Sequence, residues 1–464
     1  MKVMRRSLVG WSLVALFAIL CFGNTLAAET APELTVGIVS DIHLSRPERH
    51  KSQGAIDAFL RVLGFFKEKS VDAIVIAGDL TNGGTADELK VTAECWEQVF
   101  GSLSSGPVKV FVTGNHENNY SKEAKERWRE ILQEPDTPFF IKRVKGYAFV
   151  GAHWAAWNDE RAFRGFLQEH SGDIVGDKPF FYVQHAHPQH TCYGDWIWHR
   201  RDGGPTDKVL SDYPNAVAFS GHTHYSLTDE RSIWQGAFTS IGTASLRWLS
   251  LPAGRENGKG LKQIGHRMSD IASDYGPSQG LVMRVRGDRM VFERYDLSKM
   301  EKLGPDWDVR TLRSAGDPRP YGFAERKACL KAPEFPEGAK VTVSVVSGRS
   351  PEKTPERQVV LKFPAATAED AASRVYDYEV SAELVSGDCV LPWRTKRVFQ
   401  PGLPLSVERQ AATAACVYGA GELPPPPFRF AVTPMNAFGK RGKTIYLQID
   451  KKAAEVWSTD PKGA

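Results

Sequence analysis

The sequence is poor in cysteine, nearly neutral in charge, and without histidine in its C-terminal part. Six cysteines in 464 residues, with no Cys-x-x-Cys spacing, exclude a disulfide scaffold and a thiolate zinc site. A formal net charge of +4 on this length argues against long nucleic acid as a partner and against a polybasic membrane patch. All twelve histidines lie between His43 and His266, so the residues after 266 lack the usual ligand of a transition-metal centre.

Only the N-terminus carries a long apolar run. Basic residues at positions 2, 5 and 6 precede an apolar stretch from about 8 to 22, and small residues follow at 25, 27 and 28. This order predicts a signal peptide over residues 1–28 and a secreted or periplasmic protein. A membrane anchor is the alternative, although the run is short for a span. No transmembrane segment is expected in the mature chain. In an oxidising compartment Cys389 and Cys416 could pair, and the sequence leaves open whether Cys329 competes.

The length predicts two or three domains. Apolar runs alternate with helical patterns from Leu34 to about Leu297, which predicts an α/β domain over residues 33–297. Residues 298–321 are rich in proline and glycine and are expected to form a linker. Beyond them, short apolar runs between proline-rich turns predict an all-β sandwich over residues 322–464. The spacing of its strands resembles a fibronectin type III module.

Five polar motifs each follow an apolar, β-branched run. Such runs are typical of buried parallel strands, and ligands gather at the carboxyl ends of such strands. We therefore expect the five motifs to meet at one edge of one sheet. Asp41 and His43 should leave an extended strand end in the same direction, and glycines such as Gly221 let the backbone approach closely. The motifs are Asp41-Ile42-His43, Gly78-Asp79, Gly114-Asn115-His116-Glu117, a histidine near His185, and Gly221-His222-Thr223-His224.

The order of these motifs, from about Leu34 to Ser245, resembles the calcineurin-like metallophosphoesterases. The resemblance implies a layered α/β/β/α sandwich, here followed by the smaller all-β sandwich, and a dinuclear metal centre. It implies that one metal is bound by Asp41, His43 and His224, the other by Asn115, His185 and His222, and that Asp79 bridges them. His187 is the alternative to His185, because the family often has adjacent histidines before a proline at this place, and His185 is preferred since it lies closest to the strand end.

The ligand types suit two divalent or trivalent transition metal ions, and the sequence does not choose among manganese, iron and zinc. The family mechanism implies that a metal-bridging hydroxide is the nucleophile and that His116 is the catalytic residue beside the phosphate. Glu117 either orients its neighbours or holds the loop by hydrogen bonds. Leu80-Thr81 follows the bridging aspartate where purple acid phosphatases carry a tyrosine ligand, so a tyrosinate–ferric centre is not expected.

The expected function is therefore a secreted, metal-dependent hydrolase of small phosphate mono- or diesters. The alternative is a binding protein that uses a catalytically silent metallophosphoesterase fold. A silent relative should have lost ligands or the histidine after Asn115, and none is missing here. The β domain is expected to orient the first domain or to contact a partner.

Overall fold

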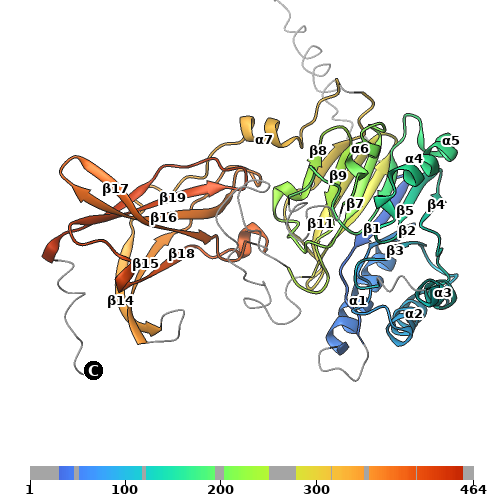
Figure 1. Ribbon diagram of the computed structural model, residues 1–464, viewed down its shortest axis with the longest axis horizontal. Coiled ribbons are helices and arrows are strands. Elements are labelled where there is room, and N and C mark those ends of the chain that lie inside the picture. The colour runs from blue at the N-terminus through green and yellow to red at the C-terminus, as the bar shows by residue number, and fades with distance from the viewer. Residues whose placement is uncertain are drawn as a thin grey trace, which may run out of the picture.

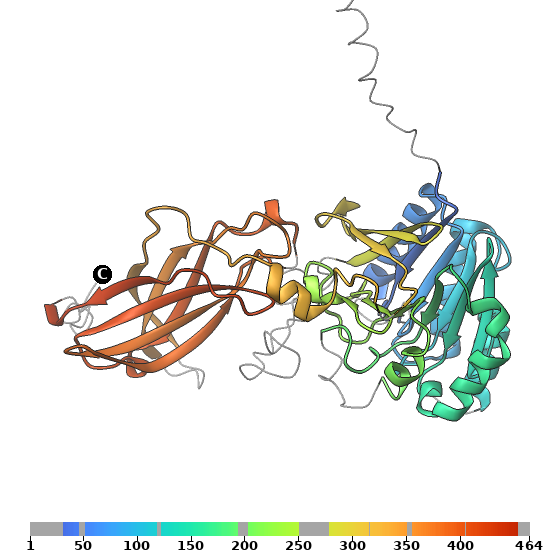
Figure 2. The same ribbon diagram turned by 90° about the horizontal axis from the view of Figure 1, so that it is seen from above.

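The computed structural model describes residues 31–45, 52–117, 122–193, 203–249, 278–314, 316–349, 355–403 and 405–452, and the predicted signal peptide lies outside them. An α/β body and an all-β body lie end to end along the long axis, with the short helix α7 (Phe323–Cys329) between them (Figures 1 and 2). Among the described helices, none has the length and hydropathy of a membrane span.

The first sheet of the α/β body has the order β12-β11-β10-β1-β2-β3, and β13 also pairs with β11. Strands β1 to β3 are parallel, and β10 joins β1 antiparallel. Along β1 and β2, alternate side chains enter two different apolar cores, so Val75 faces the second sheet and Ile76 faces the helices. Burial on both faces explains why these strands are apolar without alternation. The elements are β1 (Leu34–Val39), β2 (Ala73–Ala77), β3 (Val108–Val112), β10 (Gln279–Arg286), β11 (Arg289–Asp296), β12 (Glu301–Lys302) and β13 (Trp307–Arg310), with α1 (Ser52–Glu68), α2 (Ala86–Phe100) and α3 (Lys122–Leu132) outside them.

The second sheet has the order β4-β5-β6-β7-β9-β8 and packs against the first through one shared core. Helices α4 to α6 pack on its outer face through residues such as Phe163 and Val209. This arrangement confirms the predicted α/β/β/α sandwich. The elements are β4 (Phe139–Val144), β5 (Tyr147–Ala152), β6 (Phe180–Val183), β7 (Ala216–Ser220), β8 (Ile233–Gln235), β9 (Thr239–Gly242), α4 (Glu160–Glu169), α5 (Ser171–Ile174), α6 (Thr206–Leu210), and the 3-10 turns η1 (Ala156–Asn158) and η2 (Glu230–Ser232).

The range 298–321, expected to be a linker, contains two strands of the first sheet. Strand β13 pairs antiparallel with β11, and β12 pairs with its end. Trp307 and Val309 are buried while Asp308 and Arg310 are exposed, which is the alternation of an edge strand with one face on the core. This segment therefore extends the sheet instead of only connecting two bodies.

The C-terminal body is an all-antiparallel sandwich of a three-stranded and a four-stranded sheet, ordered β14-β15-β18 and β17-β16-β19-β20. Its likeness to fibronectin type III stays a prediction. Cys389 in β17 is exposed and Cys416 in β18 is buried; both are free, as is Cys329. The pairing that the sequence left open is thus not formed. The elements are β14 (Thr342–Arg349), β15 (Pro355–Pro364), β16 (Val375–Ser386), β17 (Cys389–Phe399), β18 (Thr413–Gly419), β19 (Phe428–Asn436) and β20 (Ile445–Ile449), with the 3-10 turns η4 (Val407–Arg409) and η5 (Ala420–Glu422).

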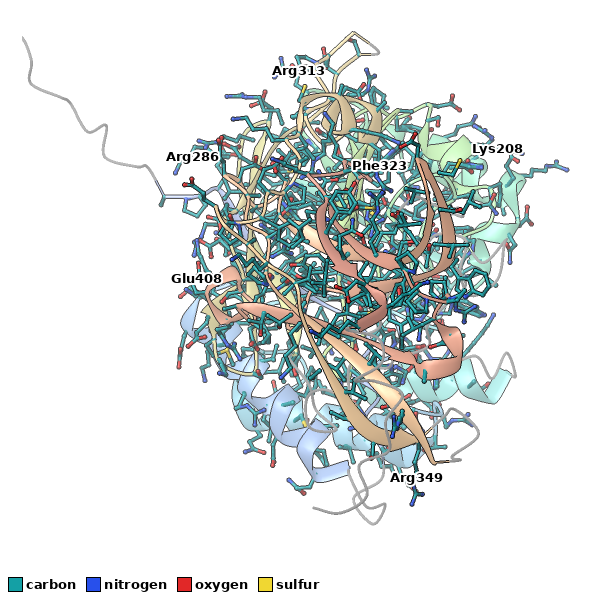
Figure 3. All side chains as sticks on the ribbon, turned by 90° about the vertical axis from the view of Figure 1, so that its left-hand side faces the viewer. Lys208, Arg286, Arg313, Phe323, Arg349 and Glu408 are labelled. Carbon is teal, nitrogen blue, oxygen red and sulfur yellow. The ribbon has the colours of Figure 1, made fainter. Side chains whose placement is uncertain are left out.

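The two bodies share buried contacts. The apolar core between the two sheets of the α/β body also includes residues of the β body, namely Tyr376, Leu403 and Phe438. The ring of Phe323, labelled in Figure 3 in the view from the β body, lies edge-on to Phe438 at 5.9 Å. The hydroxyl of Thr228 donates a hydrogen bond of 2.7 Å to the carbonyl of Leu403. The β body is therefore packed onto the α/β body through an apolar and hydrogen-bonded interface.

Candidate metal centre

Five of the seven predicted metal ligands have left-handed backbone conformations. Their φ angles are 52° at Asp41, 51° at His43, 49° at Asp79, 68° at His222 and 56° at His224. Such conformations cost roughly 1–3 kcal/mol each for non-glycine residues, although Asp and His tolerate them better than most. The expected extended strand end at Asp41 and His43 is therefore wrong. The chain instead turns sharply where each strand ends, which aims these side chains at one another.

The five motifs were expected at the edge of a single sheet, but they come from two sheets. The first three follow β1, β2 and β3 of the first sheet, and the other two follow β6 and β7 of the second. Glycines allow the close approach of the two sides. A Cβ on Gly221 would overlap the carboxylate of Asp41, and one on Gly78 would overlap the ring of His185. The site thus lies where the carboxyl ends of two facing sheets converge.

One group of ligand atoms is formed by Asp41, His43 and His224. Nε2 of His224 lies 3.0 Å from Oδ1 of Asp41 and 3.4 Å from Nε2 of His43. The three ligand atoms lie within 4.8 Å of one another, and all three residues are buried. This is the set predicted for the first metal.

A second group is formed by Asp79, His185 and His222, whose ligand atoms also lie within 4.8 Å of one another. Nε2 of His185 lies 3.1 Å from Oδ2 of Asp79 and 3.1 Å from Oδ1 of Asn115. The same Oδ2 of Asp79 lies 3.8 Å from Nε2 of His43 in the first group. One carboxylate oxygen therefore stands between the two groups, as a bridging ligand requires.

The hydrogen bonds of the histidines show whether this site fits a metal. Nδ1 of His185 lies 2.8 Å from the carbonyl of Ala77, and Nδ1 of His224 lies 2.9 Å from the carbonyl of Trp248. A carbonyl only accepts, so Nδ1 carries the proton in both rings and Nε2 of the neutral ring presents a lone pair. Each of these lone pairs faces a carboxylate oxygen. The lone pair and the carboxylate oxygen repel each other, and a cation bound between them would remove this repulsion. The residues therefore fit divalent metal ions.

The electrostatics of the site favour positive charge. Burial lowers the pKa of His185, but the carboxylates of Asp79 and Asp41 outweigh it and raise that pKa to about 10. Burial raises the pKa of Asp41, but the neighbouring His224 and His185 outweigh it and lower that pKa to about 2. The pocket is thus built to hold a cation, which either a proton or a metal ion supplies.

His185 and His187, which the sequence left as alternatives, have different surroundings. Both ring nitrogens of His187 face hydroxyls, with Nδ1 2.5 Å from Oγ of Ser220 and Nε2 2.9 Å from Oγ1 of Thr223. His187 is in none of the ligand groups found among the described residues, whereas His185 is. The geometry therefore places His185 among the candidate ligands, and His187 against the hydroxyls of Ser220 and Thr223.

His116 and Glu117 occupy different positions beside the centre. Nδ1 of His116 lies 2.9 Å from the carbonyl of Asn82, and its side chain is 35 % exposed. His116 also converges with His43 and Asp79, so its Nε2 lies within reach of a metal as well as of solvent. Both carboxylate oxygens of Glu117 accept backbone hydrogen bonds, from Thr81 at 2.6 Å and Gly114 at 2.8 Å. Glu117 thus ties together the loops after β2 and β3.

His153, which follows β5, has both ring nitrogens engaged by the backbone. Its Nδ1 accepts a hydrogen bond of 3.1 Å from the backbone N–H of Thr113, and its Nε2 lies 2.8 Å from the carbonyl of Pro135. Burial lowers the pKa of His153 to about 4, so the ring is neutral. It contributes no ligand atom.

Residues 34–226 match the family model described as calcineurin-like phosphoesterase. This part of the chain is a calcineurin-like metallophosphoesterase domain. No curated protein matches the chain. Solved structures similar to it include a dimetal phosphatase from Danio rerio, 13% identical with a TM-score of 0.40, which covers 60% of this chain and 99% of its own. A purple acid phosphatase from yellow lupin (Lupinus luteus) is 10% identical with a TM-score of 0.41, covering 60% and 53% respectively.

Two tryptophans flank the centre of this metallophosphoesterase domain, and the sequence analysis did not single them out. Trp248 stacks on His43 with ring centroids 4.7 Å apart and lies 4.4 Å from His224. Trp154 lies 5.6 Å from His185 and 5.5 Å from His222. Each tryptophan thus covers the histidines of one ligand group. For Trp154 a signal was available, because it lies two residues after the end of β5, just as Asp41 and Asp79 lie two residues after the ends of β1 and β2.

Proposed function

We propose that this protein is a metal-dependent hydrolase of small phosphate mono- or diesters that uses a dinuclear centre. The observation that supports it most is the position of Asp79 between two groups of imidazole nitrogens whose lone pairs face carboxylate oxygens. Asp41, His43 and His224 would hold one ion, and Asn115, His185 and His222 the other. We also propose that the chain is exported, which rests on its N-terminal residues alone.

The chemistry divides between the ions and the protein. Two bound ions supply positive charge for the phosphate and a water molecule of lowered pKa as the nucleophile. The protein side is clearest at His116. Its Nδ1 donates a hydrogen bond to the carbonyl of Asn82, which fixes the orientation of the ring and leaves Nε2 to donate a proton to the leaving oxygen. No serine or cysteine nucleophile is required.

The proposal is tested by turnover on a panel of phosphate mono- and diesters, with metal-loaded and chelated full-length protein. Activity should require metal. Asp79→Asn should lose both turnover and at least one ion by elemental analysis, because its carboxylate serves both groups. Asp173→Asn, the same change at an exposed pair with Arg143, is the control and should alter neither. Two ions bound without turnover on any ester would support the silent binding protein instead.

A further inference from the structure

A cavity of about 190 Å³ lies beside the metal centre. It lies between α2, α3 and the residues that follow β5, and it is partly open to solvent. Trp154 forms one of its walls, and the same indole covers His185 and His222. The cavity and the second ligand group therefore share Trp154 as a common neighbour. The other apolar walls are Leu89, Trp128, Pro138, Ala124 and Ala156.

Four polar side chains on the wall are engaged within the protein, whereas Lys125 is exposed on α3 and the buried indole N–H of Trp128 has no hydrogen-bond partner among the described residues. Glu117 accepts from backbone N–H groups, and both ring nitrogens of His153 have backbone partners. The hydroxyl of Thr113 accepts a hydrogen bond of 3.0 Å from the backbone N–H of Trp154. Asp136 pairs with Arg129 at 2.7 Å. These four engaged groups have little left to offer a polar guest, so the cavity suits a guest that is mainly apolar.

The size of the cavity limits that guest. A dry apolar cavity of about 150 Å³ in another protein binds benzene. A volume of about 190 Å³ therefore has room for one six-membered ring. We propose that this cavity binds the ring-sized apolar part of the substrate, so that the enzyme prefers phosphate esters of phenols or of similarly small apolar alcohols. This inference rests on the proposed function and adds the substrate class to it.

The test measures binding instead of turnover. The probes are phenylphosphonate and methylphosphonate, titrated calorimetrically into metal-loaded full-length protein. Burial of one ring should make phenylphosphonate bind about 10- to 100-fold more tightly. Ala124→Phe fills the cavity from helix α3 and should bring the two affinities within about 3-fold of each other. Glu130→Phe introduces the same side chain in the same helix at a 70% exposed position and should leave the preference intact.

Ala156→Leu fills the cavity from its opposite side and serves if Ala124→Phe does not fold. Equal affinities for the two phosphonates in the unaltered protein, or binding of neither, would overturn the cavity assignment, whether or not esters are hydrolysed. The cavity assignment would also be overturned if the preference for phenylphosphonate survived both filling variants, or if Glu130→Phe abolished this preference as fully as the filling variants do. If the preference behaves as expected but no ester is hydrolysed, the cavity assignment stands and the proposed hydrolase function fails.

Discussion

Glu230→Gln should destabilise the whole protein, because Glu230 neutralises a buried group of arginines between the two bodies. Its two carboxylate oxygens lie 2.7 Å from Arg294 and 2.7 Å from Arg326, and Trp307 Nε1 donates to it at 3.0 Å. Arg294 belongs to the α/β body and Arg326 to α7. The side chains of this group are at most 8% exposed. Glutamine keeps the size and removes the charge, so the guanidinium groups lose their anion without a cavity.

The pKa of Glu230 gives the magnitude. Burial raises this pKa, but Arg294, Arg326 and Arg374 outweigh it and lower it from 4.5 to about 2. At about 1.4 kcal/mol per pH unit, the ionised carboxylate contributes about 3 kcal/mol to stability at neutral pH. Loss of one partner of a buried ion pair costs about 3–5 kcal/mol, which agrees. The pKa of Glu230 is lower in the folded protein than in the unfolded chain. The contribution of its carboxylate to the unfolding free energy is therefore full above about pH 4.5 and is lost as the pH falls toward 2.

Urea unfolding followed by circular dichroism measures the effect. At pH 7, Glu230→Gln should lose about 3 kcal/mol of unfolding free energy, and the difference from the unaltered protein should narrow clearly at pH 3. Glu369→Gln is the matched control, because Glu369 is 75% exposed in its pair with Lys331 and should cost under about 1 kcal/mol. A loss below about 1 kcal/mol for Glu230→Gln, or a difference unchanged between pH 7 and pH 3, would refute the reasoning.

Two further predictions separate roles within the metal centre. His116→Ala should keep both ions while turnover falls roughly 10²–10⁴-fold, with a smaller loss for nitrophenyl esters, whose leaving groups need little protonation. A lost ion in elemental analysis would instead make His116 a ligand. His185→Ala should lose one ion, whereas His187→Ala should keep both, because the ring nitrogens of His187 face hydroxyls. If His187→Ala lost an ion and His185→Ala kept both, His187 would be the metal ligand instead of His185.

The α/β/β/α architecture could be predicted because its strands are short, apolar and separated by helices. What the residues could not show was which strand joins which sheet. Strand β10 pairs with β1 across more than two hundred residues, and no local pattern encodes that contact. The local sequence does not indicate strand β17, because Pro392 and Arg394 interrupt its apolar pattern. Both are tolerated since β17 is an edge strand of its sheet.

The residues of the candidate metal centre could be predicted as a set, but their geometry could not. Aspartate and histidine after an apolar run indicate a strand-end site, and the five motifs do converge. The left-handed turns at Asp41, His43 and Asp79 follow from tertiary packing, which holds conformations that these residues rarely adopt alone. The choice of His185 over His187 likewise depends on the hydroxyls of Ser220 and Thr223. These two hydroxyls lie near His187 only because β6 and β7 pair in the folded protein, which the local sequence does not indicate.

The β body supports the metal centre although it supplies no proposed ligand. The eight residues after His224, from 225 to 232, are all buried and lead directly from the ligand to Glu230. Within this segment the backbone N–H of Leu227 donates to Gln279, and the hydroxyl of Thr228 donates to Leu403 of the β body. A site must be held by rigid surroundings to keep its geometry. Because His224 sits at one end of a segment whose other end is fixed by the interdomain arginines, the position of this ligand depends on both bodies.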